Sequence, residues 1–228
     1  MRICVTGSTG FVGQGVVPAL LEAGFEVHAL ARGASISKIP THKNSTTFAG
    51  EALEVGSVAN ALKGCDALVH LLGARRKQLK ASGLTYEDVD VGSVRVALDA
   101  MKECGVRRII LLSAGAIGDS VYVQSKAKVE ELVKSAGVDW TILRPSFIIG
   151  PGQQWPILMT PILSLSSIIP GRIGNVARRA RNITREQLAK CVLWTLMHAE
   201  SVGKIIEVEA IRRHAKEFTP HPSLSVQG

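Results

Sequence analysis

Two residues near the middle of the chain have the types and the spacing for acid–base chemistry. Tyr122 and Lys126 stand four positions apart in the run Tyr122-Val123-Gln124-Ser125-Lys126, and residues four apart share one face of a helix. A nearby ammonium stabilises a phenolate, which lowers the pKa of a tyrosine from about 10 toward the range useful for proton transfer. The alternative is that Lys126 extends into solvent and Tyr122 is an ordinary packing residue.

The helical period indicates that Lys126 points inward. Tyr122, Lys126, Val129, Val133 and Ala136 recur on one face, and the apolar end of that face should contact the sheet. A desolvated ammonium without a partner is costly. Lys126 therefore needs a polar partner, which a cofactor ribose or a carbonyl group would supply.

A glycine-rich loop near the start of the chain indicates phosphate binding. It joins a segment of strand length to a helical pattern, and its sequence is Thr6-Gly7-Ser8-Thr9-Gly10-Phe11-Val12-Gly13. The first glycine allows a tight turn, the second lets the backbone approach a diphosphate, and the third permits close packing of helix on sheet. The helix start adds free N–H groups and a positive dipole end. The loop predicts a dinucleotide site; a glycine-rich turn without a ligand is the alternative.

The end of the second predicted strand indicates which dinucleotide binds. It reads Ala29-Leu30-Ala31-Arg32 and carries no acidic residue. Proteins that bind NAD usually place a carboxylate there for the ribose hydroxyls, whereas an arginine suits a 2′-phosphate. We therefore expect NADP(H) to be preferred over NAD(H), with Arg32 as the discriminator. The alternative is that Arg32 is merely exposed to solvent.

The elements that must position these residues follow from alternating apolar and helical patterns. The predicted strands are 2–6, 26–32, 46–50, 67–72, 108–113, 140–143 and 205–208, and the predicted helices are 12–23, 57–62, 86–103, 123–136 and 185–200. Such alternation is typical of β-α-β units and of a parallel sheet buried on both faces. We expect an α/β protein with a doubly wound parallel sheet.

One stretch interrupts this alternation, because no charged residue occurs from position 145 to 171. Pro151, Pro156, Pro161 and Pro170 divide it, and a membrane-spanning helix needs about 20 consecutive apolar residues. We therefore interpret 151–183 as an apolar and basic substrate lobe over a ligand cleft. Peripheral association with a membrane or a quinone-like substrate stays open but is not expected. Residues 212–228 are expected to form a flexible tail.

Composition limits the possible partners. The 228 residues carry 27 basic and 19 acidic side chains, a net charge of +8, which favours an anionic partner such as a phosphorylated cofactor. With two tyrosines and five phenylalanines, the chain has little material for stacking on bases, so nucleic acid is not expected. Cys4, Cys65, Cys104 and Cys191 show no metal-ligand spacing and are expected to be buried, reduced thiols. The sequence starts with a strand-like segment in place of a signal peptide, so we expect a cytoplasmic protein.

Taken together, these motifs resemble the short-chain dehydrogenase/reductase superfamily. Besides the glycine loop and Tyr-x-x-x-Lys, the motifs are Gly50-Glu51, Gly64-Cys65-Asp66-Ala67-Leu68-Val69-His70 and Leu112-Ser113-Ala114. The extended and atypical branches fit best, namely the epimerase/dehydratase-like proteins and the relatives of the NADPH-binding accessory subunit of respiratory complex I. The resemblance covers residues 1–150 well and 184–210 loosely. It implies a Rossmann-type domain over 1–211 with a small C-terminal substrate lobe.

The resemblance also implies roles for individual residues. Tyr122 would act as the acid and base, Lys126 would tune it and bind the nicotinamide ribose, and Ser113 would orient the substrate oxygen. Glu51 stands where relatives often have an aspartate that reaches the adenine, and Glu186 matches the acidic residue that opens the last long helix in relatives. The residues implied to contact the cofactor are Gly7, Ser8, Thr9, Gly10, Phe11, Val12, Gly13, Arg32, Glu51, Leu72, Gly73, Lys126, Pro145, Ser146, Phe147 and Ile148.

One departure from the family pattern leaves two functions open. Only eight residues separate Ser113 from Tyr122, fewer than in most catalytic extended members, which puts their convergence on one substrate oxygen in doubt. The first hypothesis is an NADP(H)-dependent oxidoreductase for a small carbonyl, hydroxyl or sugar-like substrate; an epimerase or dehydratase would use the same parts. The alternative is an NADPH-binding sensor or structural subunit without turnover. Monomer and homodimer both stay open.

Overall fold

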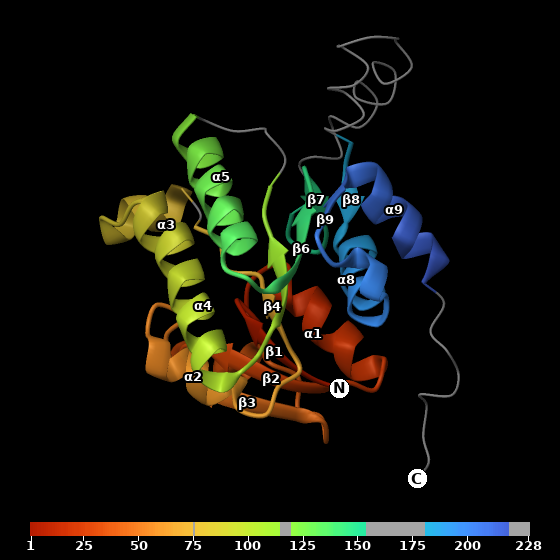
Figure 1. The fold of residues 1–228 in the computed structure, drawn as a ribbon, viewed down its shortest axis with the longest axis horizontal. Coiled ribbons are helices and arrows are strands. Elements are labelled where there is room, and N and C mark those ends of the chain that lie inside the picture. Colours follow the sequence, from red (N-terminus) through yellow and green to blue (C-terminus); the bar gives the residue numbers. More distant parts are fainter. Residues whose placement is uncertain (75, 115–119, 154–180, 219–228) are drawn as a thin grey trace.

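A parallel sheet forms the centre of the molecule in the computed structural model, which describes residues 1–74, 76–114, 120–153 and 181–218 (Figure 1). Its strand order is β3-β2-β1-β4-β5-β6-β9, which confirms the predicted Rossmann-type doubly wound sheet. The strands are β1 (Arg2–Thr6), β2 (Glu26–Ala31), β3 (Ser45–Ala49), β4 (Ala67–His70), β5 (Arg108–Leu112), β6 (Asp139–Arg144) and β9 (Lys204–Glu207). Each lies within two residues of its predicted bounds.

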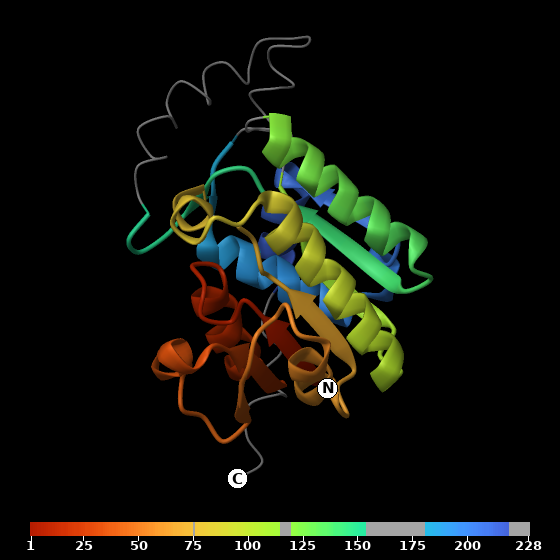
Figure 2. The same ribbon diagram turned by 90° about the vertical axis from the view of Figure 1, so that its left-hand side faces the viewer.

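Helices cover both faces of this sheet. On one face lie α1 (Gly13–Glu22), α8 (Arg185–Met197) and α9 (Val208–Glu217). On the other face lie α2 (Val55–Leu62), α4 (Gly92–Cys104) and α5 (Ser120–Ser135), and Figure 2 shows α4 and α5 side by side. Strand β1 illustrates the two cores: Ile3 and Val5 belong to the first and Cys4 to the second, because successive strand residues point to opposite faces.

Several elements differ from the sequence prediction. The expected helix 86–103 is a π-helical segment, η2 (Glu87–Val91), followed by α4. The 3₁₀ segment η1 (Gly33–Lys38), helix α3 (Arg76–Ser82) and helix α9 had not been predicted. The segment expected to be a flexible tail begins at Arg212, which lies inside α9, and residues 219–228 lie outside the described residues.

The predicted substrate lobe lies mostly outside the description as well, because residues 154–180 are not described. At its two ends, β7 (Ile148–Ile149) pairs in parallel with β8 (Ile183–Thr184). Within the described ranges, we find no helix with the length and apolarity needed to cross a bilayer. All four cysteines are free thiols; Cys4, Cys65 and Cys191 are buried as expected, whereas Cys104 is half-buried.

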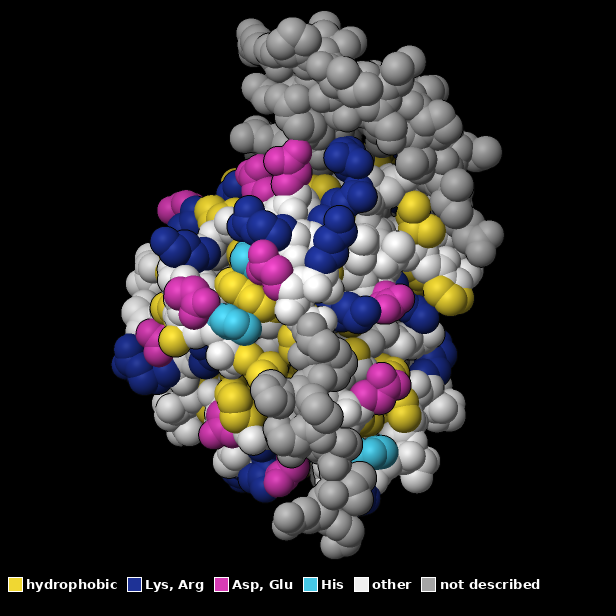
Figure 3. Space-filling view, turned by 90° about the vertical axis from the view of Figure 1, so that its right-hand side faces the viewer, with side chains coloured by type: hydrophobic (Ala, Val, Ile, Leu, Met, Phe, Trp, Pro, Cys, Tyr) yellow, Lys and Arg dark blue, Asp and Glu magenta, His cyan; other side chains and the backbone are white. Residues whose placement is uncertain are grey.

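The charged side chains do not segregate by sign on the face that carries α9. Figure 3 shows lysine and arginine side chains interspersed there with aspartate and glutamate. Helix α9 itself pairs Arg213 and His214 with Glu217. Mixed charge of this kind is typical of a solvated surface.

Candidate functional site

The glycine loop connects the carboxyl end of β1 to the start of α1, and its shape requires glycine at two positions. Gly7 has a φ of +72°, and a Cβ there would lie 2.8 Å from the backbone carbon of Leu71. A Cβ at Gly13 would lie 2.3 Å from the carbonyl oxygens of Gly7 and Ser8. No larger residue fits either position without moving the backbone.

The middle glycine of the motif, Gly10, faces open space at the helix start. A Cβ at Gly10 would meet the Gly7 carbonyl oxygen at 3.1 Å and no other described atom within 4 Å. Val12, at the N-cap of α1, makes no side-chain cap. The N–H groups of Gln14 and Gly15 donate to the carbonyl oxygens of Gly10 and Val12, so no side chain covers the helix start. An open, glycine-lined helix start of this kind fits a diphosphate.

Two further loop residues stabilise this cradle. The Ser8 hydroxyl is buried and donates a hydrogen bond of 2.7 Å to the carbonyl oxygen of Leu30. The Thr9 carbonyl oxygen accepts a 3.0 Å hydrogen bond from the side-chain amide of Gln14. Ser8 therefore connects the loop to β2, and its hydroxyl proton is committed to that bond.

The residues expected at the adenosine end follow the neighbouring strands. Arg32 comes directly after β2 as the N-cap of η1, and Glu51 comes shortly after β3; both are exposed. In the described part of the chain, no carboxylate forms an ion pair with Arg32. Since the carboxyl ends of parallel strands meet at one edge of the sheet, both residues lie on the edge that carries the glycine loop.

Lys126 is buried, as its helical position predicts, but its partner is a carboxylate. The ammonium nitrogen lies 3.1 Å from Oδ2 of Asp90, and both side chains are nearly inaccessible. The other oxygen, Oδ1, accepts a 2.7 Å hydrogen bond from the backbone N–H of Ala74. A Cβ at Gly73 would lie 3.6 Å from the Lys126 nitrogen, and Gly73 is exposed. The ammonium thus lies against an open backbone segment that was expected to line the cofactor.

Tyr122 lies one turn before Lys126, as predicted, with the ammonium 5.6 Å from its ring centroid. Its ring also contacts the edge of Tyr86, with the two centroids 5.4 Å apart. These are the two tyrosines of the chain. Ser125 donates a 3.4 Å hydrogen bond to the carbonyl oxygen of Tyr86, so the segment before η2 is attached to the first turns of α5.

His70 adds a neutral polar group beneath Lys126. Its Nδ1 lies 2.8 Å from the Thr6 hydroxyl and its Nε2 3.3 Å from the Ser93 hydroxyl. Burial, together with the positive charge of Lys126, lowers the pKa of His70 to about 3. His70 is therefore an uncharged imidazole near neutral pH, where it connects β1, β4 and α4.

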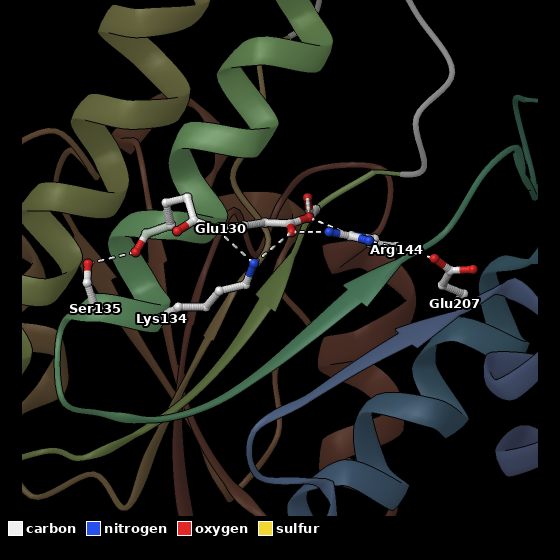
Figure 4. Close-up of polar contacts among 7 residues, drawn as sticks. Glu130, Lys134, Ser135, Arg144 and Glu207 are labelled. Atoms are coloured by element: carbon white, nitrogen blue, oxygen red, sulfur yellow. Dashed lines mark hydrogen bonds and ion pairs between the residues drawn. The ribbon is translucent and has the colours of Figure 1, made fainter.

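Ser113 lies at the end of β5, and its hydroxyl has a partner that the sequence did not indicate. It donates a 2.7 Å hydrogen bond to Oε1 of Glu130, and both side chains are buried. Figure 4 shows Glu130 between Lys134 and Arg144, with Arg144 facing Glu207 on its other side. Arg144 Nε donates at 2.8 Å to the same Oε1, and its Nη2 contacts Oε2.

The carboxylate of Glu130 is fixed in its charged form. Burial by itself would raise the pKa of Glu130, but hydrogen bonds from Arg144 and Ser113 and the charges of Arg144 and Lys134 hold it below its usual value. A charged carboxylate is an acceptor only. The single hydroxyl proton of Ser113 is therefore directed to Glu130, and the serine oxygen has only lone pairs to offer another group.

The segment expected beside the nicotinamide joins β6 to β7. Pro145 is buried, and Leu72, Ser146, Phe147 and Ile148 are half-buried. The Ser146 hydroxyl donates at 2.6 Å to the carbonyl oxygen of Arg181, and the Phe147 carbonyl oxygen accepts from Ile183 N–H at 3.0 Å. These bonds fix residues 146–149 against 181–184.

Helix α8 begins with a complete capping box. Thr184 accepts from the N–H of Gln187 at 3.0 Å, and the Gln187 side chain accepts from the N–H of Thr184 at 2.9 Å. Glu186 lies in the first turn, as expected, and pairs with Lys190 at 2.8 Å. The acidic residue is exposed and faces along its own helix.

Two carboxylates that organise this region, Asp90 and Glu130, are not among the residues predicted from the sequence. Each lies beside buried apolar residues of its own helix: Asp90 next to Val91 and Val94, and Glu130 next to Val129 and Val133. An acidic residue within a buried helical stripe must have a partner. That signal could have identified both.

The family model described as NAD(P)H-binding matches residues 7–199. A ceramide reductase from Caulobacter vibrioides is 25% identical over 220 residues, which are 95% of this chain and 67% of that protein. A 3-beta-hydroxysteroid dehydrogenase from Mycolicibacterium neoaurum is 28% identical over 182 residues, covering 67% of this chain and 49% of that protein. The chain thus spans between half and two thirds of the length of these relatives.

Solved structures show the same fold. The oxidoreductase ylbE from Lactococcus lactis superposes with a TM-score of 0.70 at 20% identity, over 97% of this chain and 98% of that one. The UDP-glucose 4-epimerase of Thermus thermophilus, solved with NAD, gives 0.67 at 19% identity, over 95% and 83% of the two chains.

Proposed function

Because the chain belongs to the NAD(P)H-binding family, we propose that it is an NADP(H)-dependent oxidoreductase of the short-chain dehydrogenase/reductase type for a carbonyl or hydroxyl compound. The observation that carries this proposal is the position of Lys126. Its ammonium lies between the Tyr122 ring, Asp90 and the open backbone at Gly73. A buried cation beside a phenol, at the sheet edge that carries the glycine loop, is suited to proton transfer.

The cofactor would lie along the carboxyl edge of the sheet. The open helix start between Gly7 and Gly13 would hold the diphosphate, and Arg32 would bind the 2′-phosphate. Glu51 lies near the expected adenine end, while Leu72, Gly73 and residues 145–148 would flank the nicotinamide. The dinucleotide would supply or accept the hydride.

The proton chemistry would depend on the chain's own side chains. Tyr122 would give its phenolic proton to the substrate oxygen, and Lys126 would stabilise the resulting phenolate. Ser113 would help to orient the same oxygen. Because its proton is directed to Glu130, Ser113 would orient that oxygen in the hydroxyl form of the substrate, by accepting a hydrogen bond from it.

Two observations favour an apolar substrate. No charged residue occurs between positions 145 and 171. In addition, the similar proteins include those named ceramide reductase, 3-beta-hydroxysteroid dehydrogenase and dihydroflavonol 4-reductase. We therefore propose a small molecule with an apolar body and one carbonyl or secondary hydroxyl group.

The cofactor preference can be tested by titration of the protein with NADPH and with NADH in a calorimeter. We expect tighter binding of NADPH, and we expect Arg32→Ala to weaken NADPH binding by about tenfold or more because it removes a charge-assisted hydrogen bond. NADH binding should change little in this variant. Equal affinities for the two dinucleotides in the unaltered protein would refute the preference.

Turnover can be tested by NADPH consumption with apolar aldehydes, diketones and 3-ketosteroids. Tyr122→Phe should abolish reduction of any substrate found, while NADPH binding should persist. Tyr86→Phe is the matched control, since it removes the hydroxyl of the neighbouring ring and leaves the proposed proton donor in place. Loss of activity in both variants to the same extent would show that the Tyr122 phenol has no role beyond that of the neighbouring hydroxyl, and would contradict the proposed proton donor.

One observation favours a second function, an NADPH-binding protein without turnover. The Ser113 proton is committed to Glu130, and the charge of Lys126 is balanced by Asp90, so both groups have partners within the protein. In this case, NADPH would bind and raise the unfolding temperature, whereas Tyr122→Phe would leave every property nearly unchanged.

A further inference from the structure

Arg185 is the first residue of α8, and it lies against the glycine loop rather than along its own helix. Helices α1 and α8 pack side by side on one face of the sheet (Figure 1, Figure 2). The guanidinium nitrogen Nη1 lies 3.5 Å from the carbonyl oxygen of Phe11, and the guanidinium carbon lies 5.5 Å from the centroid of the Phe11 ring. A residue 174 positions away thus brings a positive charge to the cradle.

Two glycines provide the space for this side chain. A Cβ at Gly15, in the first turn of α1, would lie 2.6 Å from Cγ and 3.0 Å from Nε of Arg185. A Cβ at Gly150 would lie 3.2 Å from Cβ of Arg185 and 3.0 Å from the Phe11 ring. Glycine within a helix costs about 1 kcal/mol relative to alanine, and at position 15 it lets the arginine stem lie on α1 and extend toward Phe11.

The charge of Arg185 is not balanced by the protein. In the ranges that the structure describes, no carboxylate forms an ion pair with it, and the adjacent Glu186 pairs with Lys190. Lys126 and Arg144 have acidic partners, Asp90 and Glu130. Arg108 and Arg212, like Arg185, contact backbone carbonyl oxygens and form no ion pair with a described carboxylate. A guanidinium has five N–H donors, and one long bond to a carbonyl oxygen leaves most of them available to an anion.

We propose that Arg185 is a binding residue for the diphosphate of the dinucleotide, acting together with the start of α1. The inference rests on the proposed cofactor site and adds a residue that the glycine motif does not contain. Nη1 already lies beside the carbonyl oxygen of Phe11. Phe11 directly precedes Val12, the N-cap of α1, where the helix start fits the diphosphate. A guanidinium can bind phosphate oxygens through two parallel N–H bonds, which a lysine cannot reproduce.

This role differs from that of Arg32 in a way that can be measured. The diphosphate occurs in NADPH, NADH and ADP, whereas the 2′-phosphate occurs in NADPH alone. Arg185→Met keeps the length of the stem and removes the charge. We expect it to weaken the binding of all three ligands by about tenfold or more, and to leave the weak binding of adenosine unchanged. Arg32→Met, the matched control, should weaken NADPH binding only.

A second variant displaces Arg185 without changing any charge. Gly15→Ala should move the arginine stem off α1 and reproduce the loss of ADP and NADH binding. Because alanine favours the helix, the unfolding temperature without ligand distinguishes displacement from damage to the fold. Arg185→Lys should recover only part of the affinity, since it keeps the charge without the two-pronged geometry.

Calorimetric titration of each variant with ADP, NADH, NADPH and adenosine decides between the outcomes. Weakening of ADP, NADH and NADPH with adenosine unaffected supports the proposal. Unchanged ADP and NADH affinities in Arg185→Met would overturn it, and so would an equal loss for adenosine, which would point to a general defect. If the unaltered protein binds none of the dinucleotides, the proposed function fails and this proposal fails with it. If the unaltered protein binds them and Arg185→Met binds them equally well, the role of Arg185 is refuted and the proposed function stands.

Discussion

Helix α5 carries two buried charges one turn apart, and they are stabilised in different ways. Lys126 has one charged partner, Asp90, and its ammonium lies near the open backbone at Gly73. Glu130 accepts hydrogen bonds from Ser113 and Arg144, and Lys134 lies 3.9 Å away. The two charges are four positions apart on the same helix, yet each pairs with a different element: Lys126 with η2, and Glu130 with β5 and β6.

The difference indicates which of the two charges is available to a ligand. The Glu130 carboxylate is saturated with donors, so its cluster holds β5, β6 and α5 together and has little capacity for another group. The Lys126 ammonium has three donors and, among the residues that the structure describes, one charged partner. A buried polar group with unused capacity is the one expected to bind a ligand. We interpret the Glu130 cluster as a support and the Lys126 pair as part of the site.

Removal of the support should have the largest effect on stability. Glu130→Ala leaves the half-buried guanidinium of Arg144 without its main partner and the Ser113 hydroxyl without its acceptor. We expect the free energy of unfolding to fall by about 3 kcal/mol, as is typical when one partner of a buried ion pair is removed. Urea unfolding followed by circular dichroism measures this.

Two further variants test the comparison itself. Glu130→Ala combined with Arg144→Met should cost less than Glu130→Ala alone, because no unpaired charge remains. Lys126→Met should weaken NADPH binding more than Glu130→Gln does, whereas Glu130→Gln should destabilise the fold more. The reverse order in either measurement would mean that support and site have been assigned to the wrong cluster.

Acid should destabilise the protein through His70, which lies on the Lys126 side. The folded protein keeps His70 neutral down to its pKa of about 3, whereas the unfolded chain takes up the proton near the ordinary value of 6.5. The stability that the neutral His70 contributes is therefore present above pH 6.5 and is lost as the pH falls toward 3. Between pH 6.5 and about pH 5, the loss should be about 2 kcal/mol.

His70→Asn removes the titration and keeps a polar group near the Thr6 hydroxyl. Its unfolding free energy should therefore depend less on pH in this window than that of the unaltered protein. His42→Asn is the matched control, because His42 is exposed and should leave the pH dependence as it was. An unchanged slope in His70→Asn would show that other groups cause the acid sensitivity.

The fold could be predicted from the sequence because its signals are local and repeated. Every strand of the central sheet was found, since parallel strands buried on both faces are continuous apolar runs. Helix α9 was missed: its pattern is short, with Ile211 and Ala215 separated by charged residues, and its stability comes from packing against α8. The π-helical segment η2 could not be separated from α4 because both share one apolar stripe.

The site was predictable only where a motif fixes the geometry. The glycine loop and the Tyr122–Lys126 pair are each specified by spacing along the chain. The structure has the glycines in the turn between β1 and α1, and it has Tyr122 and Lys126 one helical turn apart. Asp90, Glu130 and Arg185 meet their partners across 36, 14 and 174 positions. Spacing cannot reveal such contacts, although a charged residue in an apolar helical stripe indicates that a partner exists.

The smallest effect on stability, and the sharpest test of the two interpretations, comes from Ser113. Ser113→Ala removes one hydrogen bond to a carboxylate that Arg144 still satisfies, so the unfolding free energy should fall by only about 1 kcal/mol. A serine that donates to the substrate oxygen would cost about 10²-fold in kcat when removed. Because the Ser113 proton points to Glu130, we expect less than about tenfold loss in kcat with any carbonyl substrate found. A loss near 10²-fold with unchanged stability would show that the serine turns away from Glu130 when substrate binds, and would move Ser113 from the support to the site.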